Sequence, residues 1–207
     1  LGTLAQLGYG ADDAVVARAI QFLKDEQEED GSWFGRWGTN YIYGTWSVLS
    51  ALNAVGEDMS QPYIRRAVDW LKSRQMANGG WGEDCATYWE EQKGLAKEST
   101  PSQTAWALMG LMAATVRGWT DQLFSRAIDV LMAIPALIFA EVESGVTYLL
   151  NHPREGGKWQ ETMFNAVGFP KVFYITYHGY SAYFPLWTLS RYRNLKRSNT
   201  KRPAYGI

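Results

Sequence analysis

The sequence predicts an all-α fold: a helical-repeat α/α-barrel (toroid), of which this chain forms an incomplete arc of about two and a half helix-pair repeats. Three observations lead to this prediction. Arg18–Trp33 (RAIQFLKDEQEEDGSW) recurs without a gap 48 residues later as Arg66–Trp81 (RAVDWLKSRQMANGGW). Each copy has the apolar spacing of an amphipathic helix that ends in a Trp-bearing loop. A more apolar helical run follows each loop, so neighbouring units must stack to bury their apolar faces.

The elements follow from these patterns in chain order. In the second copy, Ile64, Val68 and Leu71 form one apolar stripe of an outer helix. The inner helices are expected at Tyr41–Val55 and Thr100–Ala114, where Thr100 suits the N-cap and Pro101 the first turn. The adjacent acids at positions 12 and 13 suit the start of the first outer helix.

A third, weaker copy runs from Ser144 to Trp159 and has Pro153 where the other copies have Gln. The spacing before it is longer, which indicates an atypical apolar insert at about 115–140, where Pro135 would kink or end a helix. The chain therefore divides into repeats with two Gln-x-x-x-Gly-x-Trp motifs at 1–114, the insert at 115–140, and the degenerate third repeat with a C-terminal aromatic helix at 141–207. Over about twenty residues the insert resembles a segment of the permease subunits of peptide importers. Three interpretations remain open: a natural insertion at a repeat junction, a membrane-contacting elaboration, and a rearranged sequence.

The repeated Gln and Trp residues are interpreted as structural. A Gln at a helix end and a Trp in the next loop can join adjacent helix pairs, because the indole N–H needs an acceptor when it is buried. This interpretation covers Gln27, Trp33, Gln75, Trp81 and Trp159.

Composition narrows the function further. A formal net charge of −1 disfavours a nucleic-acid partner, which calls for a basic surface. His152 and His178, with Cys85 as the single cysteine, are too few for a metal site, and no cofactor is expected. Aromatic residues make up 14% of the chain, with ten Trp, so the unusual feature is an excess of aromatic rings.

Four longer blocks carry a resemblance to a known family. GSWFGRWGTNYIYGTWSVLSAL, GGWGEDC, TPSQTAWAL and GFPKVFYITYHGYSAYFPLWTLSRY occur in this order. Together with the repeats, which resemble the QW motifs of triterpene cyclases, they are similar to the C-terminal part of bacterial squalene–hopene cyclases. The resemblance covers nearly the whole chain apart from the insert.

The resemblance implies a cyclase that converts squalene to hopene or hopanol through carbocations, in a cavity lined by aromatic rings. A π face stabilises a cation without quenching it. Six residues match the family's substrate-binding, cation-stabilising aromatics: Trp37, Tyr43, Phe169, Phe173, Tyr177 and Tyr180. The last four follow one another at intervals of three or four residues, which would place them on one face of a helix, although such a stripe without the resemblance is more often ordinary core.

The resemblance also implies what this chain lacks. The family's proton donor is a DxDD motif, which does not occur here, so no catalytic residue is assigned and the chain alone is expected to be inactive. The Asp84-Cys85 string resembles another acid motif, but its place after a repeat favours a structural loop. The missing acid and the start at Leu1 rather than Met indicate a fragment whose partner is the N-terminal part of the cyclase.

The family's enzymes are monotopic, which implies peripheral membrane contact at the cytoplasmic face of the inner membrane. Three alternatives remain open: a non-catalytic helical-repeat module that binds an apolar ligand, a non-functional gene remnant, and a carbohydrate-active α-barrel enzyme. The third alternative requires paired carboxylates across a cleft, and the acids here lie mostly in helix starts and loops.

Overall fold

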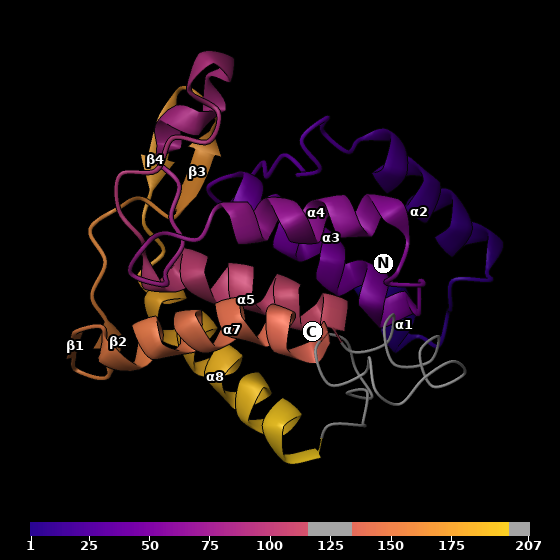
Figure 1. Ribbon diagram of the computed structural model, residues 1–207. Helices are drawn as coiled ribbons and strands as arrows, with labels where there is room; N and C mark the ends of the chain where they lie inside the picture. The colour runs from indigo at the N-terminus through magenta and orange to yellow at the C-terminus, as the bar shows by residue number, and fades with distance from the viewer. Residues whose placement is uncertain (116–133, 199–207) are drawn as a thin grey trace.

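The computed structural model describes residues 1–115 and 134–198 and is mostly helical (Figure 1). Its α-helices are α1 (Gly2–Gln6), α2 (Ala14–Asp25), α3 (Tyr41–Val55), α4 (Pro62–Ser73), α5 (Pro101–Thr115), α7 (Ile134–Asn151) and α8 (Tyr180–Ser198). Two short 3-10 helices, η1 (Cys85–Tyr88) and η2 (Glu90–Gln92), precede α5. The helical prediction therefore holds for most of the described chain, and the toroidal arc stays a prediction.

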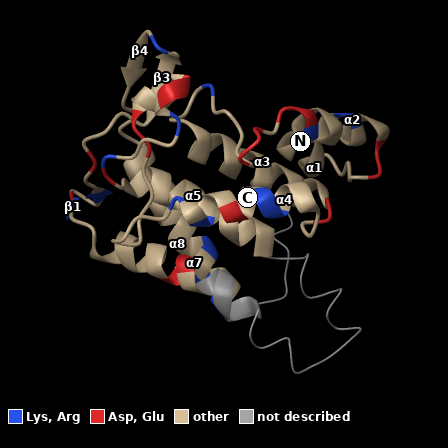
Figure 2. Ribbon diagram, turned by 45° about the horizontal axis from the view of Figure 1, so that its top comes forward, with Lys and Arg blue, Asp and Glu red and all other residues tan. Residues whose placement is uncertain are grey.

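Helices α3 and α5 form the centre of the fold and pack against each other. Neither contains a charged residue, and so both are drawn without blue or red in Figure 2. Every residue of α5 from Pro101 to Ala114 is buried, because α3, α4, α7 and α8 all pack against it. The N-terminus of α5 is built as the sequence predicts, since Pro101 opens the helix and the hydroxyl oxygen of Thr100 accepts a hydrogen bond from the Gln103 N–H at 3.3 Å.

The outer helix α2 begins next to the predicted acids. Asp13 is its N-cap residue, but its carboxylate accepts a hydrogen bond from the Gly10 N–H at 2.8 Å rather than from the helix. The acid therefore fixes the loop that precedes α2, while the position of the helix start agrees with the prediction.

Each Trp loop is fixed to its own outer helix by the same hydrogen bond. The indole N–H donates to the main-chain oxygen ten residues earlier in all three copies, at 2.6–2.7 Å. The three indoles are buried, so an N–H without an acceptor would be costly there. The pairs are Trp33 with Leu23, Trp81 with Leu71, and Trp159 with Leu149.

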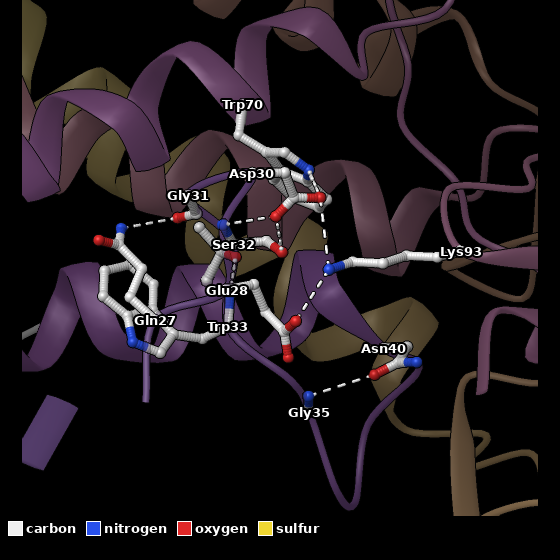
Figure 3. A network of polar contacts seen from close by, with 11 residues as sticks. Gln27, Glu28, Asp30, Gly31, Ser32, Trp33, Gly35, Asn40, Trp70 and Lys93 are labelled. Atoms are coloured by element: carbon white, nitrogen blue, oxygen red, sulfur yellow. Dashed lines mark hydrogen bonds and ion pairs between the residues drawn. The ribbon is translucent and has the colours of Figure 1, made fainter. Parts of the chain in front are cut away.

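The Gln of the motif reaches the next repeat. The Gln27 amide donates to Gly31 O within its own loop and to Tyr63 O in α4, both at 2.8 Å. Gln75 repeats this pattern with Gly79 O at 2.9 Å and Glu141 O in α7 at 3.0 Å. Figure 3 shows Gln27 beside the loop that carries Trp33. Consecutive outer helices are therefore joined through the loop between them, and the third copy lacks this donor because it has Pro153.

A lysine adds a second link between the first two repeats. Lys93 Nζ lies 3.0 Å from Glu28 and 3.5 Å from Asp30, and 4.5 Å from the centre of the Tyr41 ring. The Trp70 indole donates to Asp30 at 3.0 Å (Figure 3). Because these carboxylates are partly exposed, the ion pairs add specificity of packing more than stability.

The all-α description needs a correction, because two small antiparallel sheets are present. β1 (Arg154–Glu155) pairs with β2 (Lys158–Trp159), and β3 (Ala166–Phe169) pairs with β4 (Phe173–Ile175). The predicted helical face of four aromatic residues is therefore wrong. The physical reason is Pro170, which disfavours helical geometry at Phe169, and Lys171 then turns the chain with a φ of +66°.

The expected insert at 115–140 lies mostly outside the described residues. Its last part belongs to α7, which continues without a break into the third copy. α7 runs from Ile134 through Pro135 to Asn151, so Pro135 does not end the helix as expected.

We predict that Trp81→Phe lowers the free energy of unfolding by about 2–3 kcal/mol, because it removes a buried hydrogen bond and leaves a cavity. Urea unfolding followed by circular dichroism measures the change. Trp187→Phe is the matched control, since this indole lies at the surface with 37% of its side chain exposed, and should change stability by less than about 0.5 kcal/mol. Equal losses in the two variants would contradict a special role for the loop tryptophan.

Candidate functional site: two aromatic groups beside the Trp37 loop

The loop that carries Trp37 pairs with β3, although the two segments lie far apart in sequence. The Val167 N–H donates to Trp37 O at 3.1 Å, and the Thr39 N–H donates to Asn165 O at 3.3 Å. Gly38 and Ala166 form an antiparallel bridge between these bonds. The loop of the first repeat is thereby fixed beside the hairpin β3–β4.

The hairpin carries the first aromatic group. The Phe169 and Phe173 rings meet edge to face with their centres 5.8 Å apart. Phe169 is 56% exposed, Phe173 46% and Trp37 56%, so these rings are available to a ligand rather than buried as core. The strands place both phenylalanines at the same end of the molecule as Trp37.

The second aromatic group joins three helices. The ring centres of Tyr177 and of Tyr180, at the start of α8, are 4.9 Å apart. The ring centres of Tyr180 and of Trp106 in α5 are 5.8 Å apart. Trp106 in turn meets Tyr43 of α3 at 5.0 Å. Burial raises the pKa of Tyr43 and of Tyr180, so both remain neutral phenols at ordinary pH.

The structure therefore brings the six predicted residues together only in part. Tyr43, Tyr177 and Tyr180 share one continuous set of ring contacts, whereas Phe169 and Phe173 contact each other. The position of Trp37 is set by its main chain, and the Arg36 guanidinium lies 5.2 Å from the centre of its ring. One part of the Trp37 π system thus already has a cation beside it.

Sequence reasoning missed the residues that connect this second group. Trp46 and Trp106 stack at 6.0 Å with 8° between their planes, and Phe184 meets both rings at 5.4 Å. The sequence did contain a sign that these two tryptophans are equivalent. Trp46 and Trp106 each lie in the first half of an inner helix, one or two residues after a Thr. These threonines are equivalent: Thr45 and Thr104 accept the N–H of the motif residues Trp33 and Trp81.

Buried polar side chains hold the carbonyl groups of the Trp37 loop. The single hydroxyl hydrogen of Tyr88 is shared between two main-chain acceptors, Gly35 O at 2.8 Å and Gly38 O at 3.0 Å from the hydroxyl oxygen. The Gln103 amide donates to Thr39 O at 3.2 Å. The shape of this loop is thus fixed by residues of the second repeat.

The Gly82–Tyr88 segment, predicted to be a structural loop, supplies several of these contacts. The Asp84 carboxylate caps η1 through the Ala86 N–H at 2.8 Å and pairs with Lys97 at 2.8 Å. Glu83 is buried, and its Oε2 accepts hydrogen bonds from the Asn40 N–H at 3.1 Å and the Ile42 N–H at 2.7 Å. Burial raises the pKa of Glu83 to about 7.

No group of three or more His, Cys, Asp or Glu side chains suited to a metal ion occurs within residues 1–115 and 134–198. His152 is used locally, since its Nε2 lies 2.6 Å from Gln160 O. Among the helices that the structure describes, none has the length and apolar character needed to cross a bilayer.

We predict that Gly168→Ala displaces the Phe173 ring, because an added Cβ would occupy the position of that ring. The expected result is loss of the nuclear Overhauser contacts between the Phe169 and Phe173 rings, with the helical circular dichroism unchanged. Gly2→Ala is the control, since nothing lies within 4 Å of its added Cβ. Retention of the ring contacts in Gly168→Ala would show that the glycine does not position Phe173.

Comparison with known proteins identifies the family of this chain. The model of the squalene-hopene cyclase C-terminal domain matches residues 1–134 and 120–194. The chain is 50% identical over 198 residues to a probable squalene–hopene cyclase of Sinorhizobium fredii. The aligned region covers 95% of this chain and 28% of that protein. It is 46% identical to the squalene–hopene cyclase of Zymomonas mobilis over 99% of the chain and 28% of the relative. The enzyme of Alicyclobacillus acidocaldarius is 44% identical over 89% of the chain.

The chain spans about 28% of the length of these relatives. The family match covers most of the chain, and close relatives named as squalene–hopene cyclases align along nearly all of it. The chain therefore belongs to the squalene–hopene cyclase family and corresponds to its C-terminal domain.

Proposed function

We propose that this chain supplies part of the carbocation-stabilising surface of a terpene cyclase that converts squalene to hopene or hopanol. The observation that carries the proposal is the continuous set of ring contacts from Tyr177 through Tyr180 and Trp106 to Tyr43. Three helices of a squalene–hopene cyclase domain converge on these rings. Tyr43, Tyr177 and Tyr180 are at least partly exposed and can face a ligand, whereas Trp106 is buried and holds Tyr43 and Tyr180 in place from below.

Aromatic rings suit this chemistry for a physical reason. A cation is attracted to the negative face of a ring, by about 0.5–2 kcal/mol per ring, without forming a bond that would end the reaction. Burial keeps Tyr43 and Tyr180 neutral, so they act as π systems and not as nucleophilic phenolates. Trp37 is the exception in this set, because the Arg36 guanidinium already lies beside its ring.

The chain alone is proposed to be inactive. Protonation of an unactivated alkene requires a strong acid, and the DxDD motif is absent from these 207 residues. The buried Glu83 does not replace it, since its carboxylate accepts hydrogen bonds from the start of α3 and its raised pKa makes it a weak acid. The acid is expected to come from the N-terminal part of the cyclase, the partner of this chain.

A peripheral location at the cytoplasmic face of the inner membrane is part of the proposal. Its support is the exposed apolar side of α8, where Tyr183 is 70% exposed and Leu186 64% exposed. Squalene is apolar, so a cyclase that takes it from a bilayer benefits from such a surface. The second candidate function, a module that binds an apolar ligand without chemistry, is favoured by the same exposed side chains and by the absence of the acid.

A cationic ligand separates these two candidates. We predict that the purified chain binds a protonated squalene-like amine more tightly than the matching hydrocarbon. Tyr180→Leu should weaken binding of the amine about 5–30-fold, the equivalent of about 1–2 kcal/mol of cation–π attraction, and weaken the hydrocarbon less. Isothermal titration calorimetry measures both affinities. Tyr9→Leu, a surface substitution outside the ring set, is the control, and equal affinity for amine and hydrocarbon would support the non-catalytic module.

We also predict that the chain alone produces no hopene from squalene. Placed in the Sinorhizobium relative instead of the matching 198-residue segment, it should restore production, because the two segments are 50% identical. Gas chromatography of the extracted products measures both reactions, with the unmodified relative as the reference. Hopene from the chain alone would refute the missing-acid proposal, and a folded but inactive chimera would refute the proposed contribution of this chain.

A further inference from the structure

A glutamate two residues after the motif Trp caps the inner helix of the preceding repeat. Glu83 follows Trp81 at this spacing, and it accepts a hydrogen bond from Ile42, the second residue of α3, at 2.7 Å. Glu161 follows Trp159, and it accepts one from Ser102, the second residue of α5, at 3.0 Å. The two helix starts are therefore held in the same way by the next Trp loop.

The two glutamates differ in how completely they are bonded. Both oxygens of Glu161 have partners: Oε2 accepts from the Ser102 N–H, and Oε1 accepts from the Ser102 hydroxyl at 3.1 Å and the Asn165 amide at 2.7 Å. Glu83 is only 3% exposed, and its Oε1 has no hydrogen-bond partner within the described part of the chain. A buried carboxylate oxygen without a partner is costly when the group is charged.

We propose that Glu83 is a positioning residue that holds the segment from Trp37 to Tyr43 against α5 through the main-chain N–H groups of Asn40 and Ile42. Its meaning for catalysis rests on the proposed function, because this segment carries two of the proposed cation-stabilising rings. Tyr43 is the third residue of α3, one position after the capped Ile42.

The main chain of Glu83 is itself fixed to α5. Its N–H donates to Gln103 Oε1 at 2.7 Å, and its carbonyl accepts from Gln103 Nε2 at 3.1 Å. The carboxyl group therefore connects the start of α3 to the helix that carries Trp106, which meets Tyr43 at 5.0 Å. Movement of the α3 start would change the distance between these two rings.

We expect the attachment to depend on the protonation of Glu83, because the carboxyl group is buried and its Oε1 has no hydrogen-bond partner in the described part of the chain. Burial raises its pKa to about 7, outweighing the opposing effects of the Ile42 and Asn40 hydrogen bonds and of Arg74, while Asp30 raises it further. The other titratable groups that face it are Tyr41 on α3 and, in η1, Cys85 and Tyr88. A carboxyl pKa above its unfolded value favours the closed state at low pH, and this advantage is lost as pH rises toward 7 and the group ionises. The α3 start is thus expected to loosen as pH rises from 5 to 8.

Amide hydrogen exchange of the whole chain, followed by NMR, tests this. Protection factors for the Asn40 and Ile42 amides, corrected for intrinsic rates, should fall at least 10-fold between pH 5 and 8. Glu83→Gln keeps an acceptor oxygen and removes the titration, so its protection should not depend on pH. Glu83→Ala removes the acceptor and should lower protection at both pH values. A 5-fluorotryptophan label at position 37 should shift with the same pH midpoint in the native chain only.

Glu161→Ala is the matched control. It should lower protection of the Ser102 amide and leave Asn40 and Ile42 unchanged. Protection of Asn40 and Ile42 that is independent of pH in the native chain would overturn the proposal, and so would the same pH dependence in Glu83→Gln. If Glu83→Ala does not fold, the native profile and Glu83→Gln still decide. No readout involves squalene or turnover, so failure of the proposed cyclase function would leave this result unaffected.

Discussion

Each Trp loop of this protein is held by hydrogen bonds from its own repeat and from its neighbours, and the remaining structure depends on that constraint. The indole fixes the loop to the outer helix before it, at 2.6–2.7 Å in all three copies. The Gln reaches forward to the next outer helix, and the Glu after the Trp reaches back to the previous inner helix. A buried loop must satisfy its main-chain groups, and here the satisfying partners are the adjacent repeats.

The positions of the aromatic rings depend on these hydrogen bonds between the repeats. Tyr43 and Trp106 lie on α3 and α5, the two inner helices whose starts are capped by Glu83 and Glu161. Neither inner helix contains a charge, so their rings meet in surroundings where electrostatic attraction is weakly screened. Tyr180 is held differently, because it opens α8 directly after the β3–β4 hairpin and its N–H donates to Tyr177 O at 2.9 Å.

The sequence predicted those parts of the fold that repeat. Periodicity located α3 to the residue and α5 to within one residue, and turn chemistry identified Thr100 and Pro101 at the α5 start. The hairpin was missed because four aromatics at helical spacing imitate a helix, whereas one proline at position 170 decides the local conformation. Trp106 was missed because its equivalence to Trp46 marks a repeated position in the inner helices, and a repeated position alone does not distinguish a ring that contacts Tyr43 from ordinary core. Contacts such as Glu83 with Asn40 join residues 43 positions apart, and a single sequence contains no signal for them.

The first repeat differs from the other two at the position two residues after the motif Trp, and this difference accompanies the exposed Trp37 ring. Where the second and third copies have Glu after the Trp, the first has Gly35, and a Cβ there would collide with Asn40 O. The Gly35 N–H donates a hydrogen bond to the side-chain oxygen of Asn40 at 3.2 Å, which closes a tight turn around Trp37. The glutamate that caps a neighbour is incompatible with this turn, because any side chain at position 35 would open it. The copy without the glutamate is therefore the one whose loop presents the exposed Trp37 ring. The second copy, through Glu83, and the third, through Asn165, bind that loop.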